Sequence, residues 1–132
     1  MKLDHIGIVV PKLEAGFEVW RPLVGEPLAP PEEVPGGRIR VGFLSAGGVH
    51  VELVEPTADD SAVSKFLSTR GGGLHHVAFA VPDVTQALMD VVARGGRIID
   101  AKARPGSRGR LVGFAHPSAF GGVLVEFVSG AP

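Results

Sequence analysis

Apolar residues along the chain recur with two different periods. In the segments 5–10 and 76–81, bulky apolar side chains occupy every second position, as in a β-strand that buries one face. In the segments 13–24 and 84–92 they recur every three or four positions, as in an α-helix that buries one side. Each helical segment follows one of the strands, so the pattern predicts the same strand-and-helix unit twice.

The ends of the helices are marked to different degrees. Asp83 is a suitable N-cap for the second helix, and the glycine pair 95–96 ends it. The first helix is expected over residues 13–24, where Pro22 should break or bend its last turn. A third, short helix is expected over residues 61–70, before a run of three glycines.

The strand-and-helix units belong to an internal repeat that covers almost the whole chain. Residues 5–11 match residues 76–82 at an offset of 71. After three additional residues in the second copy, residues 48–54 match residues 122–128 at an offset of 74. Several strand-like segments follow the helix in each copy, which predicts two βαβββ modules.

The expected architecture is therefore an α+β fold in one domain, residues 1–132. Module 1 extends from about residue 2 to 55, a linker helix from about 56 to 73, and module 2 from about 74 to 129. The two tandem modules should be related by a pseudo-twofold axis and form a curved mixed sheet. At 132 residues the chain has the length of one ordinary domain.

Charge and composition favour a small-molecule ligand. With 13 basic and 14 acidic residues the net charge is -1, so no nucleic-acid or membrane partner is expected. No apolar run has the length of a signal-peptide core or a membrane span, so a cytoplasmic location is expected. The chain has no Cys, which leaves His, Asp and Glu as metal ligands.

One face of the repeated strands carries candidate chemistry. His5 and His76 occupy the same repeat position, each followed on its face by small residues that leave room for a ligand. Glu52 and Glu126 interrupt apolar strands, where a lone carboxylate is costly to bury without a partner. Two imidazoles and two carboxylates suit Co, Ni, Mn, Fe or Zn, so the curved sheet is expected to surround one metal site. Taken singly, each of these residues is more often an ordinary hydrogen-bonded strand residue, but their symmetry favours ligation.

The remaining histidines have weaker signals. His75 is one position out of phase with His76, so a structural role on the opposite face is expected. His50 shares a face with Glu52 but has no His counterpart in module 2, so it is expected to line the site without ligating. His116 lies in a turn to which the sequence assigns no role.

Six segments resemble the methylmalonyl-CoA epimerase family of the vicinal-oxygen-chelate (glyoxalase/bleomycin-resistance/dioxygenase) superfamily. The most specific of these segments lie within residues 60–79 and at residues 121–126. The six are residues 5–11, 52–56, 61–67, 71–79, 104–106 and 121–126.

The resemblance implies a metal-dependent epimerase that exchanges the proton at C2 of an acyl-CoA substrate. It implies that His5, Glu52, His76 and Glu126 bind one divalent ion, which could be Co, Mn, Ni, Zn or Mg, and it implies a homodimer. Glu126 is the candidate catalytic base at the metal.

The chain departs from the family where some epimerases have a further acid/base Glu, because Val41 occupies that position by our alignment. A Lys that is common in the family's turn after the His-Pro pair is replaced by Ser118. The second proton carrier is therefore left open among Glu32, Glu33, His50 and a water on the metal. Residues 102–110 contain a basic stretch, which either contacts the CoA phosphates or is simply solvated. Its members are Lys102, Arg104, Arg108 and Arg110.

Two other functions remain open from the sequence. The paired modules also fit a glyoxalase-type lyase or isomerase that acts on a thiol adduct. A non-catalytic member that binds a small molecule would have the same fold.

Overall fold

The computed structural model describes residues 1–34 and 36–130, which divide into two compact units. Residues 5–75 form the N-terminal unit, and residues 1–4 together with residues 76–130 form the C-terminal unit. Within these described ranges no helix has the length and apolar character needed to cross a membrane.

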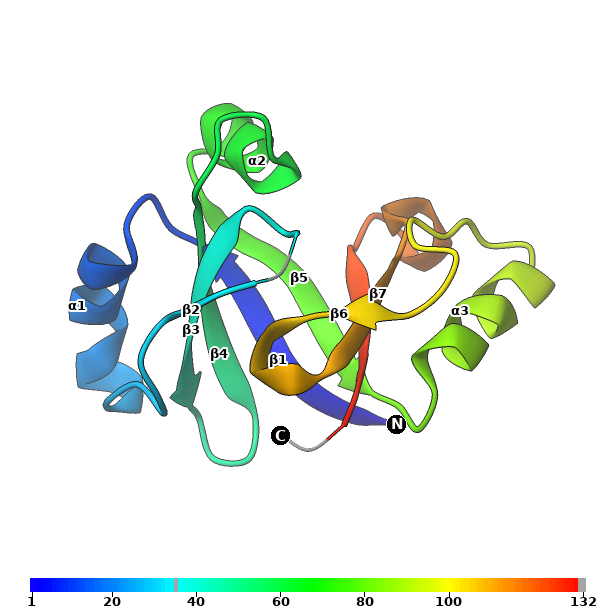
Figure 1. Cartoon of the computed structure of the whole chain (residues 1–132), viewed down its shortest axis with the longest axis horizontal. Coiled ribbons are helices and arrows are strands. Elements are labelled where there is room, and N and C mark those ends of the chain that lie inside the picture. The colour runs from blue at the N-terminus through cyan, green and yellow to red at the C-terminus, as the bar shows by residue number, and fades with distance from the viewer. Residues whose placement is uncertain (35, 131–132) are drawn as a thin grey trace. The chain divides into compact units, whose positions relative to one another are not determined.

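The N-terminal unit contains one mixed set of strands with two helices (Figure 1). The strand order is β2-β3-β4-β1, in which β1 is parallel to β4 and the other neighbours are antiparallel. Its elements are β1 (Lys2–Val9), α1 (Leu13–Val24), β2 (Glu32–Glu33), β3 (Ile39–Ser45), β4 (His50–Pro56) and α2 (Ala62–Arg70).

The C-terminal unit repeats this topology with longer connections after α3 and between β7 and β8. Its strand order is β5-β8-β7-β6, with β5 parallel to β8 and the other neighbours antiparallel. Its elements are β5 (Gly73–Ala80), α3 (Val84–Ala93), β6 (Arg104–Pro105), β7 (Leu111–Ala115) and β8 (Val125–Ser129), with 3-10 turns at Ser107–Gly109 and Pro117–Phe120. The predicted pair of βαβββ modules is therefore confirmed.

The alternating pattern of each first strand sorts its side chains as predicted. In the N-terminal unit, Ile6 and Ile8 pack in one apolar cluster with Leu13 and Phe17 of α1. In the C-terminal unit, Val77, Phe79 and Val81 pack in a cluster with Val84, Leu88 and Val91 of α3. Helix α1 contacts β3 and β4, and α3 contacts β7 and β8, so one sheet face in each unit is covered by a helix (Figure 1).

The predicted Asp83 cap of α3 is confirmed, and Ser61 caps α2 in the same way. Asp83 accepts a hydrogen bond from the Gln86 amide at 3.0 Å, and Ser61 accepts one from the Ser64 amide at 3.0 Å. Helix α1 has the expected bounds, Leu13–Val24, and Pro22 lies inside its last turn without ending it. Pro22 removes a single amide donor close to the end of the helix, where the geometry can continue for two more residues.

Candidate functional site

The N-terminal unit places His5 beside Glu52. Strands β1 and β4 are parallel neighbours, and Gly7 lies opposite Glu52 in their register. The His5 Nε2 atom lies 3.4 Å from Glu52 Oε1, and both residues are buried, at 3% and 7% exposure. Because Gly7 has no side chain, it leaves room for the His5 imidazole to reach the Glu52 carboxylate.

The C-terminal unit contains the equivalent pair. In the parallel register of β5 and β8, Ala78 lies opposite Glu126. The His76 Nε2 atom lies 3.2 Å from Glu126 Oε1, and these residues are buried at 5% and 6% exposure. The two His–Glu pairs therefore lie on equivalent strands with the same register, each within its own unit. Their distances from Nε2 to Oε1 are nearly equal.

A phenylalanine supports each imidazole. Phe43 lies opposite Glu52 across β3 and β4, and its ring meets His5 edge-on at 5.5 Å between centroids. Phe114 lies opposite Glu126 and meets His76 at 5.6 Å in the same way. These two rings were not among the predicted site residues, although they occupy the same repeat position at an offset of 71. Each ring limits the orientations of its histidine, which holds the Nε2 atom toward the carboxylate.

The atoms of each pair fit a divalent cation. A neutral imidazole nitrogen and a carboxylate oxygen are donors that Zn, Co, Ni and Mn accept in proteins. Burial of a carboxylate next to a histidine is unfavourable unless positive charge compensates it, and a bound cation would supply that charge. Each half of the predicted ligand set is thus assembled and buried inside its own unit.

The remaining histidines have three separate environments. His75 is half-buried, and its ring meets Phe66 of α2 edge-on at 4.9 Å between centroids. His50 lies opposite His5 in the register of β1 and β4, and its ring lies 6.1 Å from that of Phe43. His116 acts as a cap, because its Nδ1 atom accepts a hydrogen bond from the Ser118 amide at 3.0 Å.

The basic stretch before β7 does not behave as one exposed patch. Arg110 is buried at 4% exposure and donates two hydrogen bonds to Asp4, at 2.7 and 3.0 Å. Its guanidinium is therefore unavailable to a CoA phosphate. Arg104 pairs with Asp100 at 3.0 Å and lies over the Phe114 ring at 5.6 Å, which leaves Lys102 as an exposed cation of this stretch.

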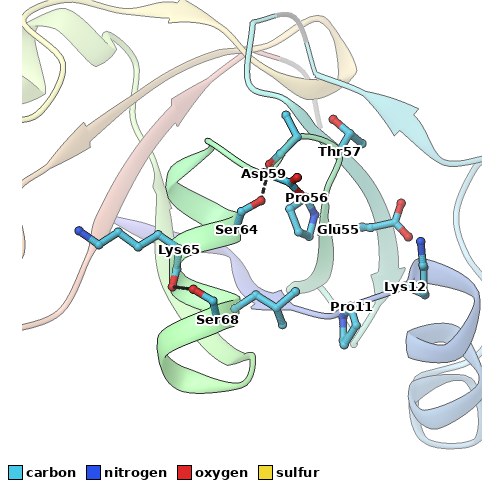
Figure 2. Close-up of a pocket in the computed structure, with 11 residues that line it drawn as sticks. Pro11, Lys12, Glu55, Pro56, Thr57, Asp59, Ser64, Lys65 and Ser68 are labelled. Carbon is cyan, nitrogen blue, oxygen red and sulfur yellow. Dashed lines mark hydrogen bonds between the residues drawn. The ribbon is translucent and has the colours of Figure 1, made fainter.

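A hollow of about 820 Å³ beside α2 has no equivalent chemistry (Figure 2). Its wall includes Glu55, which accepts hydrogen bonds from the Leu13 amide and from Arg40, both at 3.1 Å. The Ser64 hydroxyl donates to the Ala58 carbonyl, and the Lys65 amine extends away from Glu55 in Figure 2. Because these polar groups serve the local backbone or point away, the hollow is not a candidate active site.

The chain is similar to known enzymes over nearly its full length. The model of the glyoxalase/bleomycin resistance protein/dioxygenase superfamily matches residues 4–114. The mitochondrial methylmalonyl-CoA epimerase of Bos taurus is 35% identical over 126 residues, which are 95% of this chain and 72% of that protein. The ethylmalonyl-CoA/methylmalonyl-CoA epimerase of Cereibacter sphaeroides is 32% identical over 127 residues, or 95% of each chain.

Solved structures agree with these sequence matches. A variant of Streptomyces coelicolor methylmalonyl-CoA epimerase in complex with 2-nitronate-propionyl-CoA superimposes with a TM-score of 0.90 at 36% identity. The match covers 99% of this chain and 95% of that one. The chain belongs to the methylmalonyl-CoA epimerase family within the glyoxalase/bleomycin resistance protein/dioxygenase superfamily.

Proposed function

We propose that the protein epimerises methylmalonyl-CoA by proton exchange at C2. The observation that carries this proposal is the pair of buried His–Glu sets at equivalent strand positions, in a chain whose relatives are named for this activity. C2 lies between the thioester and the carboxylate, and the thioester carbonyl acidifies its proton. The substrate is therefore suited to a site that stabilises negative charge next to a positioned base.

We propose further that His5, Glu52, His76 and Glu126 bind one divalent cation together. The support is their equivalence in the repeat and the donor chemistry of each buried pair. When bound, the cation would stabilise the negative charge that develops on the thioester oxygen as C2 loses its proton. Co, Mn, Ni, Zn and Mg are all compatible with the proposal.

Glu126 is proposed as the base that removes the C2 proton. Its carboxylate is held on β8 by the register with β7 and is adjacent to His76, so it has a fixed position. The surrounding residues Val125 and Phe127 belong to the apolar cluster under α3 and keep the strand rigid. A base in a fixed position reduces the entropy cost of reaching the transition state for proton removal.

The test is deuterium incorporation into methylmalonyl-CoA by the metal-loaded protein in D₂O. We expect exchange at C2 together with interconversion of the two epimers. Succinyl-CoA, which has no stereocentre at that position, serves as the control for nonspecific exchange. Turnover of a glutathione thioadduct without any exchange into methylmalonyl-CoA would instead support a glyoxalase-type reaction, and binding without turnover would support a non-catalytic member.

Two further properties remain predictions of the sequence. A homodimer predicts an apparent mass near twice the 13.7 kDa of the chain in sedimentation equilibrium. A cytoplasmic location predicts that the native protein fractionates with the cytosol of its source cell.

A further inference from the structure

Inversion at C2 needs a second proton carrier, because the new proton must arrive on the face opposite the one that the first base leaves. This inference rests on the proposed function. We infer that Glu32, on the short strand β2, is the second acid/base group. The sheet register of the N-terminal unit distinguishes Glu32 from the other candidates.

The register places Glu32 on the same face as the His5–Glu52 pair. Side chains of directly opposite residues in neighbouring strands project to the same face of a sheet. Glu32 lies opposite Val41 between β2 and β3, and Val41 lies opposite Val54 between β3 and β4. Val54 is two residues after Glu52 on β4, so period-two alternation returns both to one face.

The same register excludes Glu33. This residue lies opposite Arg40, whose side chain donates to Glu55 at 3.1 Å and to Glu14 of α1 at 2.6 Å. Those contacts are on the side of the sheet that α1 covers. Glu33 therefore projects away from the His5–Glu52 face, although it is adjacent to Glu32 in sequence.

His50 shares the correct face but is a less suitable proton carrier. It lies opposite His5 and two residues before Glu52, so both of its near neighbours are proposed ligands. Its ring also meets the Phe43 ring edge-on at 6.1 Å between centroids, so it is packed among the proposed ligands and their supporting phenylalanine.

The surface between Glu32 and the His5–Glu52 pair is apolar. Val41 is 1% exposed and belongs to a cluster with Val9, Phe43 and Val54 on this face. Glu32 is itself only half-buried, at the border of this cluster, so it can exchange its proton with solvent. Val63 of α2 belongs to the same cluster, so these apolar residues are packed together and limit the access of water on this side of the proposed site.

The proton transfers balance without another reactant. Glu126 takes the C2 proton from one face, and the electron pair of the broken C–H bond moves into the enolate. Protonated Glu32 then donates its proton to C2 on the other face, and the enolate electrons form the new C–H bond. Glu126 ends protonated and Glu32 ends as a carboxylate, and both return to their starting states by exchange with water.

The experiment compares Glu32→Gln with Glu33→Gln as the matched control. For each metal-loaded variant, inversion and deuterium incorporation are measured separately from the two pure epimers, and metal content is measured in the same samples. We expect Glu32→Gln to lose inversion by about 10²–10⁴-fold. The epimer whose proton faces Glu126 should still take up deuterium without inverting. Glu33→Gln should keep both activities, and both variants should keep their metal.

The outcomes separate the inference from the proposed function. If the unaltered protein neither inverts nor exchanges methylmalonyl-CoA, the proposed function and this inference fail together. If it does both, and Glu32→Gln inverts at the unaltered rate, Glu32 is not the second group while the proposed function stands. Equal loss of exchange from both epimers in Glu32→Gln would also overturn the inference, because that pattern indicates a damaged site.

Discussion

His75 and His76 are adjacent in sequence and have different surroundings. The ring of His75 packs against Phe66, whereas His76 is buried beside Glu126 and Phe114. Period-two alternation along β5 causes this difference. The chemistry of a strand residue here depends on its phase as much as on its type.

Replacing His76 with Ala should lower the metal content of the purified protein sharply, because one nitrogen donor of a four-donor set is lost. His75→Ala is the matched control and should keep its metal, since its ring contacts Phe66. Metal per chain is measured by atomic emission after dialysis. Equal loss in both variants would contradict the assignment of His76 as a ligand.

Glu52 and Glu126 have equivalent positions but different proposed roles. Glu→Gln keeps an oxygen donor of similar size and removes the negative charge and most of the basicity. We expect Glu126→Gln to lose isotope exchange by about 10²–10⁴-fold more than its loss of metal explains, because it also removes the base. Glu52→Gln should lose exchange only in proportion to metal. If both variants lose isotope exchange only in proportion to their loss of metal, Glu126 is a metal ligand and not the base.

At the scale of elements, one glycine in each unit lets a helix lie close to a strand. A Cβ atom at Gly42 would meet the Phe17 ring of α1, and one at Gly113 would meet Leu88 of α3 at 2.8 Å. Gly42 and Gly113 occupy the same repeat position. In each module this glycine therefore allows the helix to pack close to the strand.

Gly113→Ala should destabilise the protein by about 1–3 kcal/mol, because the added methyl group overpacks the interface with α3. The free energy of unfolding is measured in urea. The combination with Leu88→Ala provides the control, since it removes the closer contact of the methyl group and leaves only the one with Val84 at 3.0 Å. A double variant whose destabilisation equals the sum of the two single variants would show that Gly113 and Leu88 are not in contact.

The parts of the fold and site that the sequence predicted depend on interactions between residues that are close in sequence. The helix at Val84–Ala93 and its Asp83 cap depend on neighbouring residues, as does the strand phase that selected His5 and His76. Helix α1 keeps its expected bounds, because Pro22 lies only two residues before the end of the helix. The faces of Glu32 and Glu33 required the pairing of β2 with β3, which no local period encodes.

At the scale of the whole molecule, one buried ion pair joins distant parts of the chain. Arg110, just before β7, donates two hydrogen bonds to Asp4 of β1, across 106 positions of sequence. Both residues belong to the C-terminal unit, and Asp4 directly precedes His5. No periodicity links the two positions, so the sequence suggested only a basic stretch near Arg110.

Removing one partner of this pair should be far more damaging than removing both. Arg110→Met leaves the Asp4 carboxylate buried without its guanidinium, and we expect a loss of about 3–5 kcal/mol of unfolding free energy. The double variant Asp4→Leu with Arg110→Met removes both charges and fills similar volume, so it should recover most of that loss. Urea denaturation at pH 7 measures all three proteins. If the double variant is as unstable as Arg110→Met, the pair stabilises through packing of the arginine stem rather than through charge. If Arg110→Met is as stable as the unaltered protein, the buried contact contributes no net stability and the N-terminal strand is held by its backbone pairing alone.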